Sequence, residues 1–286
     1  MYTRTIQQVI EKNLFKGKVI VIYGARRVGK TTLAKQILSD HPDGKYINCE
    51  LLQYKSALET TNSQLLNDFI GKTKLLILDE AQNIKDIGRV LKIISDTFTG
   101  VQVIATGSSS FELYNKLSEP LTGRSRFFHL YPLSIEELHQ NYSFIELDAK
   151  LVNILRFGLY PEVFGQSESE AVEELQNISS TYLFKDVLQL ENLKRSDLVF
   201  KLLKALALQL GNEISYNEIA SLLGENVHTI KRYIEILERA FIIFRLSSFS
   251  QNLRKELAKR NKIYFFDTGI RNAIINNFSP FDTRND

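Results

Sequence analysis

The sequence predicts an α/β fold with a parallel β-sheet, and two stretches of it carry that prediction. Residues 19–23 (VIVIY) and 75–78 (LLIL) are short, continuous apolar runs, which are typical of strands buried on both faces of a parallel sheet. Stretches with apolar residues at three- and four-residue spacing, typical of helices, lie between the predicted strands. With 286 residues, the chain is long enough for two or three compact units with a sizeable core.

The first predicted strand leads directly into a glycine-bounded loop. Residues 24–31 (GARRVGKT) fit the pattern G-x-x-x-x-G-K-[ST] of a phosphate-binding loop, and residues 32–38 continue with helical spacing. Gly24 and Gly29 allow the loop to curl so that its N–H groups point inward, and the helix adds its positive dipole end. We expect Lys30 to reach the β- and γ-phosphates and the Thr31 hydroxyl to bind Mg²⁺. The other residues expected to line the nucleotide are Ala25, Arg26, Arg27, Val28 and Thr32.

A pair of acids follows the second buried run. Asp79 and Glu80 stand where that strand ends, which is the edge of a parallel sheet where ligands bind. Asp79 is predicted to hold the Mg²⁺ shell, and Glu80 to act as the base that orients and deprotonates water. Two solvated acids at a strand end are the alternative, but the upstream loop favours a nucleotide site. The chain lacks an N-K-x-D motif at the place expected for guanine recognition, so ATP is the predicted nucleotide.

Polar and basic residues follow two further predicted strands. The strand predicted over 101–106 ends in Thr106 and is followed by Gly107 and three serines. We expect Thr106 or Ser108 to contact the γ-phosphate or the attacking water. The alternative is that the serines only cap the following helix. Arg124, before the strand predicted over 127–131, is the candidate to neutralise the γ-phosphate of a neighbouring subunit, with Arg126 as second choice. The alternative is that both arginines simply flank an edge strand.

The composition is that of an ordinary globular protein. The formal net charge of +3 permits contact with nucleic acid without requiring it. The single cysteine excludes an internal disulfide and a CxxC metal site, which suits a reducing compartment. No apolar run approaches membrane-spanning length and the N-terminus lacks a signal-peptide core, so we expect a cytoplasmic protein without a membrane partner.

Several strings together resemble a large group of prokaryotic AAA+-like P-loop ATPases. They are GARRVGKTTL, LLILDEAQ, TGSSS, LTGRS and YPLSIEEL. The resemblance implies a P-loop core over 1–132 with parallel strand order 5-1-4-3-2, a helical lid over 133–195 and a winged-helix domain over 196–286. Many AAA+ proteins have a sensor asparagine where this chain has Gly107. The group usually continues into a restriction-endonuclease-like part, so we expect a truncated or naturally short chain without nuclease activity.

The predicted lid consists of helices over 133–142, 149–157 and 169–193. Between the second and third stands Gly158-Leu159-Tyr160-Pro161-Glu162. It resembles the G-x-P element with which the lids of some AAA+ relatives touch adenine, which makes Pro161 a candidate adenine contact. An ordinary Gly/Pro helix breaker is the alternative.

The predicted winged helix contains a helix-turn-helix. Helices are expected over 198–210, from Ser215 onward and over 227–237, with wing strands over 241–246 and 263–266. The candidate contacts to DNA are His228, Thr229, Lys231, Arg232, Arg254, Lys255, Lys259 and Arg260. Glu235 and Glu238 on the recognition helix oppose this interpretation, and winged helices also dock proteins or serve a purely structural role.

The functional prediction is Mg-ATP binding and hydrolysis, coupled to the winged helix and its DNA or protein partner. A homo-oligomer follows if Arg124 acts in trans. One alternative is a nucleotide-gated binding switch with little or no turnover, and another is a DNA-binding regulator in which the nucleotide is structural. Consecutive acids at 79 and 80 favour turnover. The switch is favoured because two choices stay open: Thr106 or Ser108 as the sensor of the γ-phosphate, and Arg124 or Arg126 as the arginine that acts on a neighbouring subunit.

Overall fold

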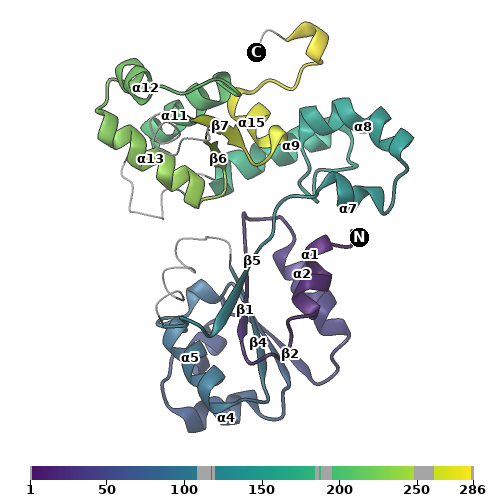
Figure 1. Ribbon diagram of the computed structural model, residues 1–286, viewed down its shortest axis with the longest axis vertical. Helices are drawn as coiled ribbons and strands as arrows, with labels where there is room; N and C mark the ends of the chain where they lie inside the picture. Colours follow the sequence, from purple (N-terminus) through teal and green to yellow (C-terminus); the bar gives the residue numbers. More distant parts are fainter. Residues whose placement is uncertain are drawn as a thin grey trace, which may run out of the picture. The chain divides into compact units, whose positions relative to one another are not determined.

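The computed structural model describes residues 2–107, 117, 120–183, 187, 195–247 and 261–284 (Figure 1). The chain divides into two compact units, Met1–Asn141 and Tyr142–Asp286. In the described part of the chain, no helix is both long and apolar enough to cross a bilayer.

The first unit is built on a five-stranded parallel sheet. Its strands are β1 (Val19–Tyr23), β2 (Gly44–Asn48), β3 (Leu75–Asp79), β4 (Gln102–Gly107) and β5 (Ser125–His129). They lie in the order β2-β3-β4-β1-β5, so β1 pairs with β4 on one side and β5 on the other. The predicted α/β class and the predicted strand order, read here from the opposite edge, are both confirmed. All five strands end at the same edge of the sheet, because every pair is parallel.

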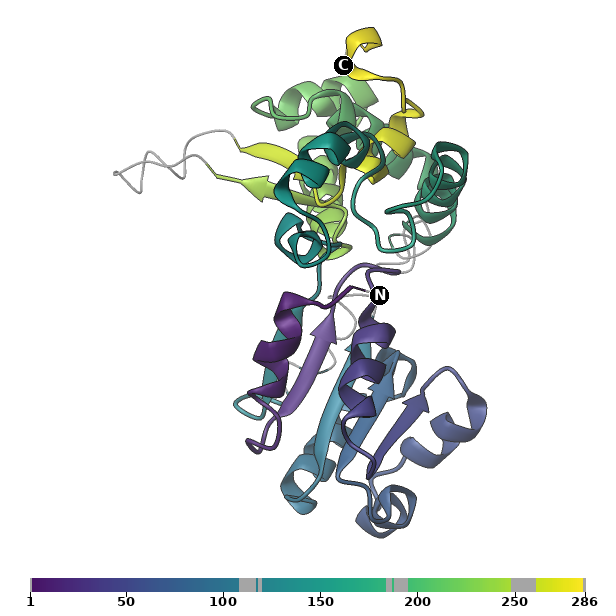
Figure 2. The same cartoon turned by 90° about the vertical axis from the view of Figure 1, so that its right-hand side faces the viewer.

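Helices cover both faces of this sheet. Figures 1 and 2 show α1 and α2 on one face and α4 and α5 on the other. The helical elements of the unit are α1 (Thr5–Glu11), α2 (Lys30–Ser39), α3 (Leu52–Leu58), α4 (Ser63–Ile70), η1 (Ala81–Asn83), α5 (Ile87–Thr97) and α7 (Ile135–His139). A sheet covered on both faces explains why the strands are continuous apolar runs rather than alternating ones.

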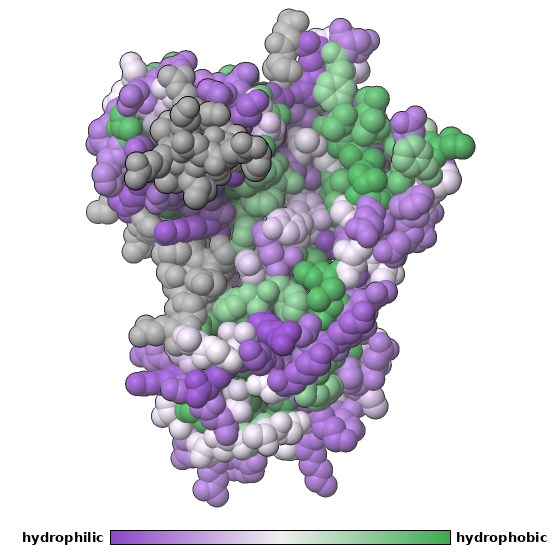
Figure 3. All heavy atoms as spheres, in the orientation of Figure 1, coloured by the Kyte–Doolittle hydropathy of each residue, from purple (hydrophilic) through white to green (hydrophobic). Residues whose placement is uncertain are grey.

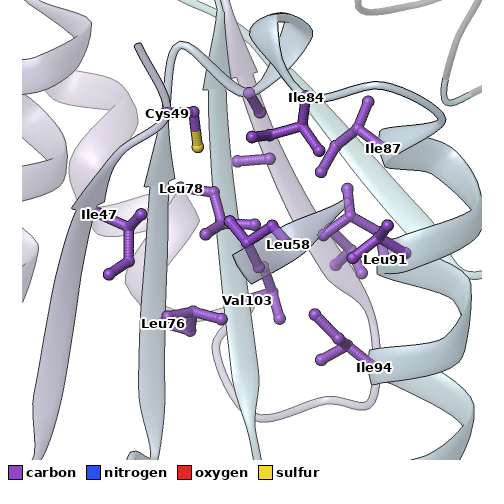
Figure 4. Close-up of a cluster of buried hydrophobic side chains, with 14 of the residues drawn as sticks. Ile47, Cys49, Leu58, Leu76, Leu78, Ile84, Ile87, Leu91, Ile94 and Val103 are labelled. Atoms are coloured by element: carbon purple, nitrogen blue, oxygen red, sulfur yellow. The ribbon is translucent and has the colours of Figure 1, made fainter. Parts of the chain in front are cut away.

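Alternate residues of the central strand β3 enter two different layers of the core. Leu76 and Leu78 point toward the α3–α5 face, where they pack with Leu91 and Ile94 of α5 (Figure 4). Their neighbours Leu75 and Ile77 must therefore point toward the opposite face. The four apolar residues of β3 have 0% exposed surface, which anchors the strand that carries Asp79.

Two sequence predictions for this unit differ from the structure. The apolar residues Ile6, Val9, Ile10 and Leu14 stand at helical spacing and predict an amphipathic helix over 4–15. The helix ends at Glu11 instead, because residues 12–15 turn, with the Asn13 side chain donating to the Val9 carbonyl and Phe15 at φ +56°. Helix α3 was not predicted at all. Of its apolar residues only Leu58 is fully buried, and Leu52 is 78% exposed, so its sequence carries no clear amphipathic period.

The second unit is mainly helical. It contains α8 (Phe144–Phe157), α9 (Glu168–Asn177), a π-helical turn η2 (Ile178–Leu183), α11 (Ser196–Leu208), α12 (Tyr216–Leu223), α13 (Val227–Arg239), β6 (Ile243–Leu246), β7 (Lys262–Phe265), α15 (Thr268–Ile275) and η3 (Phe281–Thr283). Strands β6 and β7 form an antiparallel pair after the α12–α13 helix-turn-helix. These elements agree with those expected of a winged helix, and its division from a lid stays a prediction. The long helix predicted over 169–193 changes to π-helical geometry after Asn177, and its last part lies mostly outside the described residues.

Helix α8 starts five residues before the helix predicted from the sequence. Ser143 and Glu146 form a reciprocal capping box that marks its true beginning. Phe144 and Ile145, in the first turn, are 76% and 81% exposed, so they do not fit the apolar stripe that buries Leu147 and Phe157. Figure 3 shows the resulting apolar side chains at the surface in the region of α8.

Helix α15, near the end of the chain, holds the second unit together. It packs against α8, α9 and α11, which precede it by up to 130 residues. Its N-cap residue, Asp267, accepts hydrogen bonds from the backbone N–H of Ile270 at 3.0 Å and of Leu159 at 2.7 Å. Asp267 therefore joins the start of α15 to the turn after α8. The sequence pattern alone did not predict this helix, because its role depends on distant partners.

Candidate nucleotide-binding site

The glycine-rich loop connects β1 to α2, as the sequence predicts. Gly24 has φ +153°, and a Cβ at this position would collide with the carbonyl oxygen of Leu130, just beyond the end of β5. Gly29 adopts φ +96° as the N-cap of α2, which begins at Lys30. Only glycine adopts both conformations readily, because it has no Cβ. The loop therefore closes tightly against the ends of β1 and β5, with the N-terminus of α2 behind it.

Lys30 lies inside this loop. Only 5% of the residue's surface is exposed. The ammonium group donates hydrogen bonds to the carbonyl oxygens of Gly24, at 3.0 Å, and Ala25, at 2.7 Å. The loop backbone thus holds a buried cation beside the dipole end of a helix, which is an arrangement suited to an anionic phosphate.

The carboxylate of Asp79 is the centre of a hydroxyl cluster. Thr31 Oγ1 donates to Asp79 Oδ2 at 2.8 Å, and Tyr46 Oη donates to the same oxygen at 2.5 Å. The hydroxyl of Thr106 donates to the other oxygen, Oδ1. The pKa of the Tyr46 phenol lies well above its usual value, mainly because the side chain is partly buried and secondly because it donates a hydrogen bond to Asp79. The strands thus bring together residues from α2, β2, β3 and β4.

This donor set suits a hard divalent cation. The Thr31 hydroxyl and the Asp79 carboxylate supply oxygen atoms 2.8 Å apart, and oxygen is the ligand that Mg²⁺ prefers. Among the described residues, no group of three or more His, Cys, Asp or Glu side chains is placed to hold a metal ion. Thr31 and Asp79 are therefore the residues that would hold Mg²⁺, together with water and phosphate oxygens, in the manner typical of this ion.

Glu80 is oriented by the residues around it. Its backbone adopts φ +54°, and its N–H donates to Thr106 Oγ1 at 3.3 Å. The side-chain amide of Gln82 donates to Glu80 Oε2 at 2.5 Å, and that of Asn83 donates to the Glu80 carbonyl at 3.0 Å. The orientation of the half-buried Glu80 carboxylate is therefore fixed by η1, the turn that directly follows it in the chain. Thr106 is 0% exposed and bonds both acids, so it orients them.

An aromatic group borders the loop at the end of β5. His129 stacks on Tyr23, with ring centroids 5.0 Å apart. The ring of Tyr131 also contacts the His129 imidazole, with ring centroids 3.8 Å apart. Burial, and secondarily the charge of Lys30, lowers the pKa of His129 to about 4. The imidazole is therefore neutral at pH 7, which avoids a second cation directly beside Lys30.

The remaining predicted site residues lie elsewhere. Arg124 immediately precedes β5, at the sheet edge opposite to the one that carries Lys30 and Asp79, and pairs with Asp96 at 2.7 Å. Arg126 bonds the side-chain amide oxygen of Asn13. Neither arginine reaches the nucleotide loop of its own chain, because parallel strands separate the two edges. Ser108 and the basic residues Arg254, Lys255, Lys259 and Arg260 lie outside the described residues.

Pro161 belongs to the second unit, in a turn built around a buried carboxylate. Gly158 has φ +75°, and a Cβ there would collide with Asp267 Oδ1. Leu159 donates its N–H to the same carboxylate, and Tyr160 is 2% exposed. The glycine of this element is thus required by its packing against Asp267. The predicted contact of Pro161 with adenine stays a prediction.

The exposed face of α13 is more basic than the sequence suggests. The exposed residues along it are His228, Lys231, Arg232, Glu235 and Arg239. Glu238 does not face outward freely, because Arg245 of β6 binds it at 2.5 Å and also donates its backbone N–H to it. The side chain of Asn226 caps the helix by accepting a hydrogen bond from the backbone N–H of Thr229 at 2.7 Å. One acid, Glu235, remains on this face among four basic or histidine side chains.

Four residues at the site were missed by the sequence analysis: Arg4, Tyr46, Gln82 and His129. Gln82 follows Glu80 by two positions and could have been noticed as a polar residue beside the predicted base. The other three reach the site only through the fold. For example, Arg4 Nη1 donates to the Val28 carbonyl of the loop at 2.6 Å, across 24 positions of the chain.

Comparison with known proteins agrees with this geometry. Residues 16–139 match the family model described as "AAA domain", which spans the sheet, the loop and both acids. Residues 16–139 therefore belong to the AAA-type P-loop domains. Residues 148–280 match a second model, described as a domain of unknown function (DUF8612). That match crosses the predicted boundary between lid and winged helix.

Relatives of this chain occur in archaea and bacteria. An uncharacterized protein of Methanocaldococcus jannaschii is 30% identical over 285 residues, covering 92% of this chain and 64% of the relative. An uncharacterized protein of Mycobacterium tuberculosis is 25% identical over 267 residues, covering 93% of this chain and 58% of the relative. The chain therefore spans about three fifths of the length of these curated relatives.

A solved structure shares the whole fold. The Walker-type ATPase PABY2304 of Pyrococcus abyssi superposes with a TM-score of 0.65 at 16% identity, covering 96% of both chains. At this identity the likeness concerns the fold alone. It extends over both units, including the helical second unit that the AAA domain model does not match.

Proposed function

We propose that the protein binds Mg-ATP and hydrolyses it, and that the nucleotide state controls an interaction of its helix-turn-helix module. The observation that carries this proposal is the continuous hydrogen-bonded set formed by Thr31, Asp79, Thr106 and Glu80 at one sheet edge. This set lies next to the loop that encloses Lys30. Together they supply the phosphate, metal and base functions that hydrolysis of a phosphoanhydride requires.

Binding comes first in this proposal. The N–H groups of residues 24–31 and the N-terminus of α2 receive the phosphates, and the ammonium of Lys30 turns from loop carbonyls toward them. The hydroxyl of Thr31 and the carboxylate of Asp79 hold Mg²⁺, which neutralises phosphate charge when bound. ATP is favoured over GTP, since the chain lacks the guanine-recognition motif at the expected position.

In the hydrolytic step, Glu80 orients a water molecule and accepts its proton. Such a base must be held in one orientation to act efficiently. The bond from its N–H to Thr106 and the bond from Gln82 to its carboxylate provide that orientation. Thr106 therefore acts on both acids, and we assign it a positioning role rather than direct contact with the γ-phosphate.

Arg124 is proposed to act on a neighbouring subunit. It is about half exposed, and its partner Asp96 is equally accessible. An exposed ion pair of this kind is weak, so the guanidinium can exchange Asp96 for phosphate at little cost. Turnover per subunit should then rise with protein concentration and should fall on dilution through dissociation.

The module of α12, α13, β6 and β7 is the proposed interaction site, with duplex DNA as the favoured partner. Its candidate contacts on α13 are His228, Thr229, Lys231 and Arg232. The withdrawal of Glu238 by Arg245 supports this choice, because it removes one acid from the face that would meet phosphates. A protein partner is the alternative outcome.

A nucleotide-gated switch without appreciable turnover is the second candidate. The contact that favours it is the bond from Gln82 to Glu80, because the amide N–H occupies a carboxylate oxygen that would otherwise accept a hydrogen bond from the attacking water. In this alternative, ATP binding alone would change the affinity of the helix-turn-helix for its partner.

The deciding experiment compares steady-state ATP hydrolysis by wild type, Glu80→Gln and Lys30→Ala, each with and without duplex DNA. We expect turnover in wild type, a loss of about 100-fold or more in Glu80→Gln with ATP still bound, and loss of ATP binding in Lys30→Ala. Circular dichroism confirms that the variants fold. Tight ATP binding by wild type with no turnover would establish the switch instead. If Lys30→Ala left DNA affinity unchanged and independent of ATP, the nucleotide would be merely structural.

A further inference from the structure

Tyr46 lies at the sheet edge proposed to bind the metal, but it belongs neither to the glycine-rich loop nor to the acid pair. It is the third residue of β2, and β2 pairs in parallel with β3, with Tyr46 opposite Ile77 and Asn48 opposite Asp79. From this position its hydroxyl reaches Asp79 Oδ2 at 2.5 Å. The ring lies only partly buried, on the side of the sheet that carries α2.

The oxygen that Tyr46 contacts is the one that matters for a metal. Asp79 Oδ2 also accepts the hydrogen bond from Thr31, at 2.8 Å. The Thr31 hydroxyl and this carboxylate are the two protein groups suited to hold Mg²⁺ in the proposed function. Tyr46 thus donates to the same oxygen as the ligand hydroxyl, while Thr106 binds the opposite oxygen. The hydroxyls of Thr31 in α2, Tyr46 in β2 and Thr106 in β4 together fix the Asp79 carboxylate in a single orientation.

Tyr46 is itself held in place by the helix that carries Thr31. The ammonium of Lys35 lies 4.7 Å from the centroid of the Tyr46 ring. A cation at this distance over an aromatic face is attracted to it. Lys35 follows Thr31 by four positions on α2, so both residues project from the same side of the helix. The ring therefore cannot swing away without losing a second contact.

We propose that Tyr46 is a positioning residue of the metal site, which sets the affinity for Mg²⁺ by fixing Asp79 toward Thr31. The proposal rests on the proposed function, because it assumes that Mg-ATP binds at this edge. Groups that orient a metal ligand through a hydrogen bond typically change metal affinity by about 10- to 100-fold when removed. Without the phenol, the Asp79 carboxylate keeps two hydroxyl partners on opposite oxygens but loses the one that comes from β2.

The test measures how Mg²⁺ changes the affinity for a non-hydrolysable ATP analogue, so that turnover plays no part. Binding to the full chain is followed by calorimetry across a series of Mg²⁺ concentrations and, separately, in EDTA. We expect Tyr46→Phe to leave the affinity in EDTA within about twofold of wild type and to raise the Mg²⁺ concentration for half-maximal enhancement about 10-fold. Mn²⁺ binding, followed by electron paramagnetic resonance, should weaken by a similar factor.

Matched variants separate this role from a general loss of structure. Tyr54→Phe removes a phenol whose ring packs against Phe69 of α4, 6.3 Å away, and should behave as wild type. Lys35→Gln keeps the Tyr46 hydroxyl but loses the charge over its ring, and should give a smaller shift in the same direction. Asp79→Asn should abolish the effect of Mg²⁺. All variants are first compared by thermal unfolding.

Each outcome has one meaning. If Mg²⁺-dependent binding in Tyr46→Phe equals that of wild type, or is tighter because the phenol competed with the metal, the inference is overturned and the proposed function stands. If wild type binds the analogue equally well with Mg²⁺ and in EDTA, the metal site is wrong, and the inference falls with it. If wild type binds no ATP analogue, the proposed function itself fails.

Discussion

Arg4 and Glu137 form a buried ion pair, with Arg4 Nε 3.0 Å from Glu137 Oε1 and their side chains only 6% and 4% exposed. The guanidinium also donates to the carbonyl of Val28 in the nucleotide loop at 2.6 Å and to that of Tyr131 after β5 at 2.5 Å. The carboxylate accepts from the N–H of Ser134 at 3.1 Å. A single buried pair thus joins the N-terminal segment, the nucleotide loop and the segment that follows the sheet.

Breaking this pair should destabilise the first unit strongly. Glu137→Gln leaves the buried guanidinium without its counter-charge, and we expect the free energy of unfolding in urea to fall by about 3–5 kcal/mol. The exposed pair between Arg124 and Asp96 is the control. Asp96→Asn should cost less than about 1 kcal/mol, because solvent screens that pair. Equal losses in the two variants would contradict the role given to burial.

Gly24 is required by a close approach and by its backbone conformation. We expect Gly24→Ala to abolish ATP binding and lower the melting temperature, because its Cβ would collide with the Leu130 carbonyl. Gly71→Ala is the matched control. Gly71 also has positive φ, +61°, but nothing lies within 4 Å of its Cβ position. That variant should lose about 1–3 kcal/mol of stability, because φ +61° with ψ −130° is a combination that residues with a Cβ rarely adopt, and it should bind ATP normally. Normal ATP binding by Gly24→Ala would refute this explanation.

Thr106 should affect turnover more than binding. Thr106→Val removes the hydroxyl that donates to Asp79 and accepts from the Glu80 N–H. We expect kcat to fall about 10- to 100-fold, while the Kd for ATP in EDTA changes less than about threefold. Thr106→Ser, which keeps the hydroxyl, should recover most of the activity. A serine variant as impaired as the valine variant would show that the methyl group matters instead.

Asp267 should make the second unit lose stability as the pH rises. Burial, only partly offset by hydrogen bonds from three backbone N–H groups, raises the pKa of its carboxyl from 3.8 to about 6. The folded state therefore binds a proton more tightly than the unfolded state. This stabilising contribution is fully present below about pH 4 and is lost as the pH rises through about 6.

The measurement for Asp267 is the difference in melting temperature between wild type and Asp267→Asn from pH 4 to pH 7. Wild type should lose stability relative to the variant over this range. The difference is needed because the pKa values of Glu146, Glu168 and Glu170 are lowered, by hydrogen bonds from Ser143, Arg156 and Ser167, so these acids act in the opposite direction. A difference that does not change with pH would show that Asp267 stays ionised in the folded protein.

The basic face of α13 should bind duplex DNA through phosphates. We expect Lys231→Gln combined with Arg232→Gln to weaken DNA binding and to reduce the slope of log K against log salt by up to about 2. Glu235→Gln, on the same face, should strengthen binding slightly. Fluorescence anisotropy at several salt concentrations measures both effects. Unchanged DNA affinity in the double variant would exclude this face as the contact.

Much of the fold could be predicted from the sequence, and so could the glycine-rich loop and the acid pair of the candidate site. Gly24 to Thr31 form one contiguous motif, and Asp79 and Glu80 follow a buried strand directly, so local patterns identify all of them. The strand order was predicted through the resemblance to AAA+-like ATPases and is confirmed. By contrast, α3 and α15 were missed, because exposed leucines hide the period of one and distant contacts define the other.

The sequence by itself determined where the candidate phosphate-binding and metal-binding residues stand along the chain, because a glycine-bounded loop and a strand-ending acid pair are local features. Only the tertiary structure decided which residues hold those groups in place. Tyr46 meets Asp79 across 33 positions, and the Arg4 side chain reaches the Tyr131 carbonyl across 127. Such partners depend on how strands and helices pack, and a buried hydrogen bond or ion pair leaves no periodic pattern in the sequence.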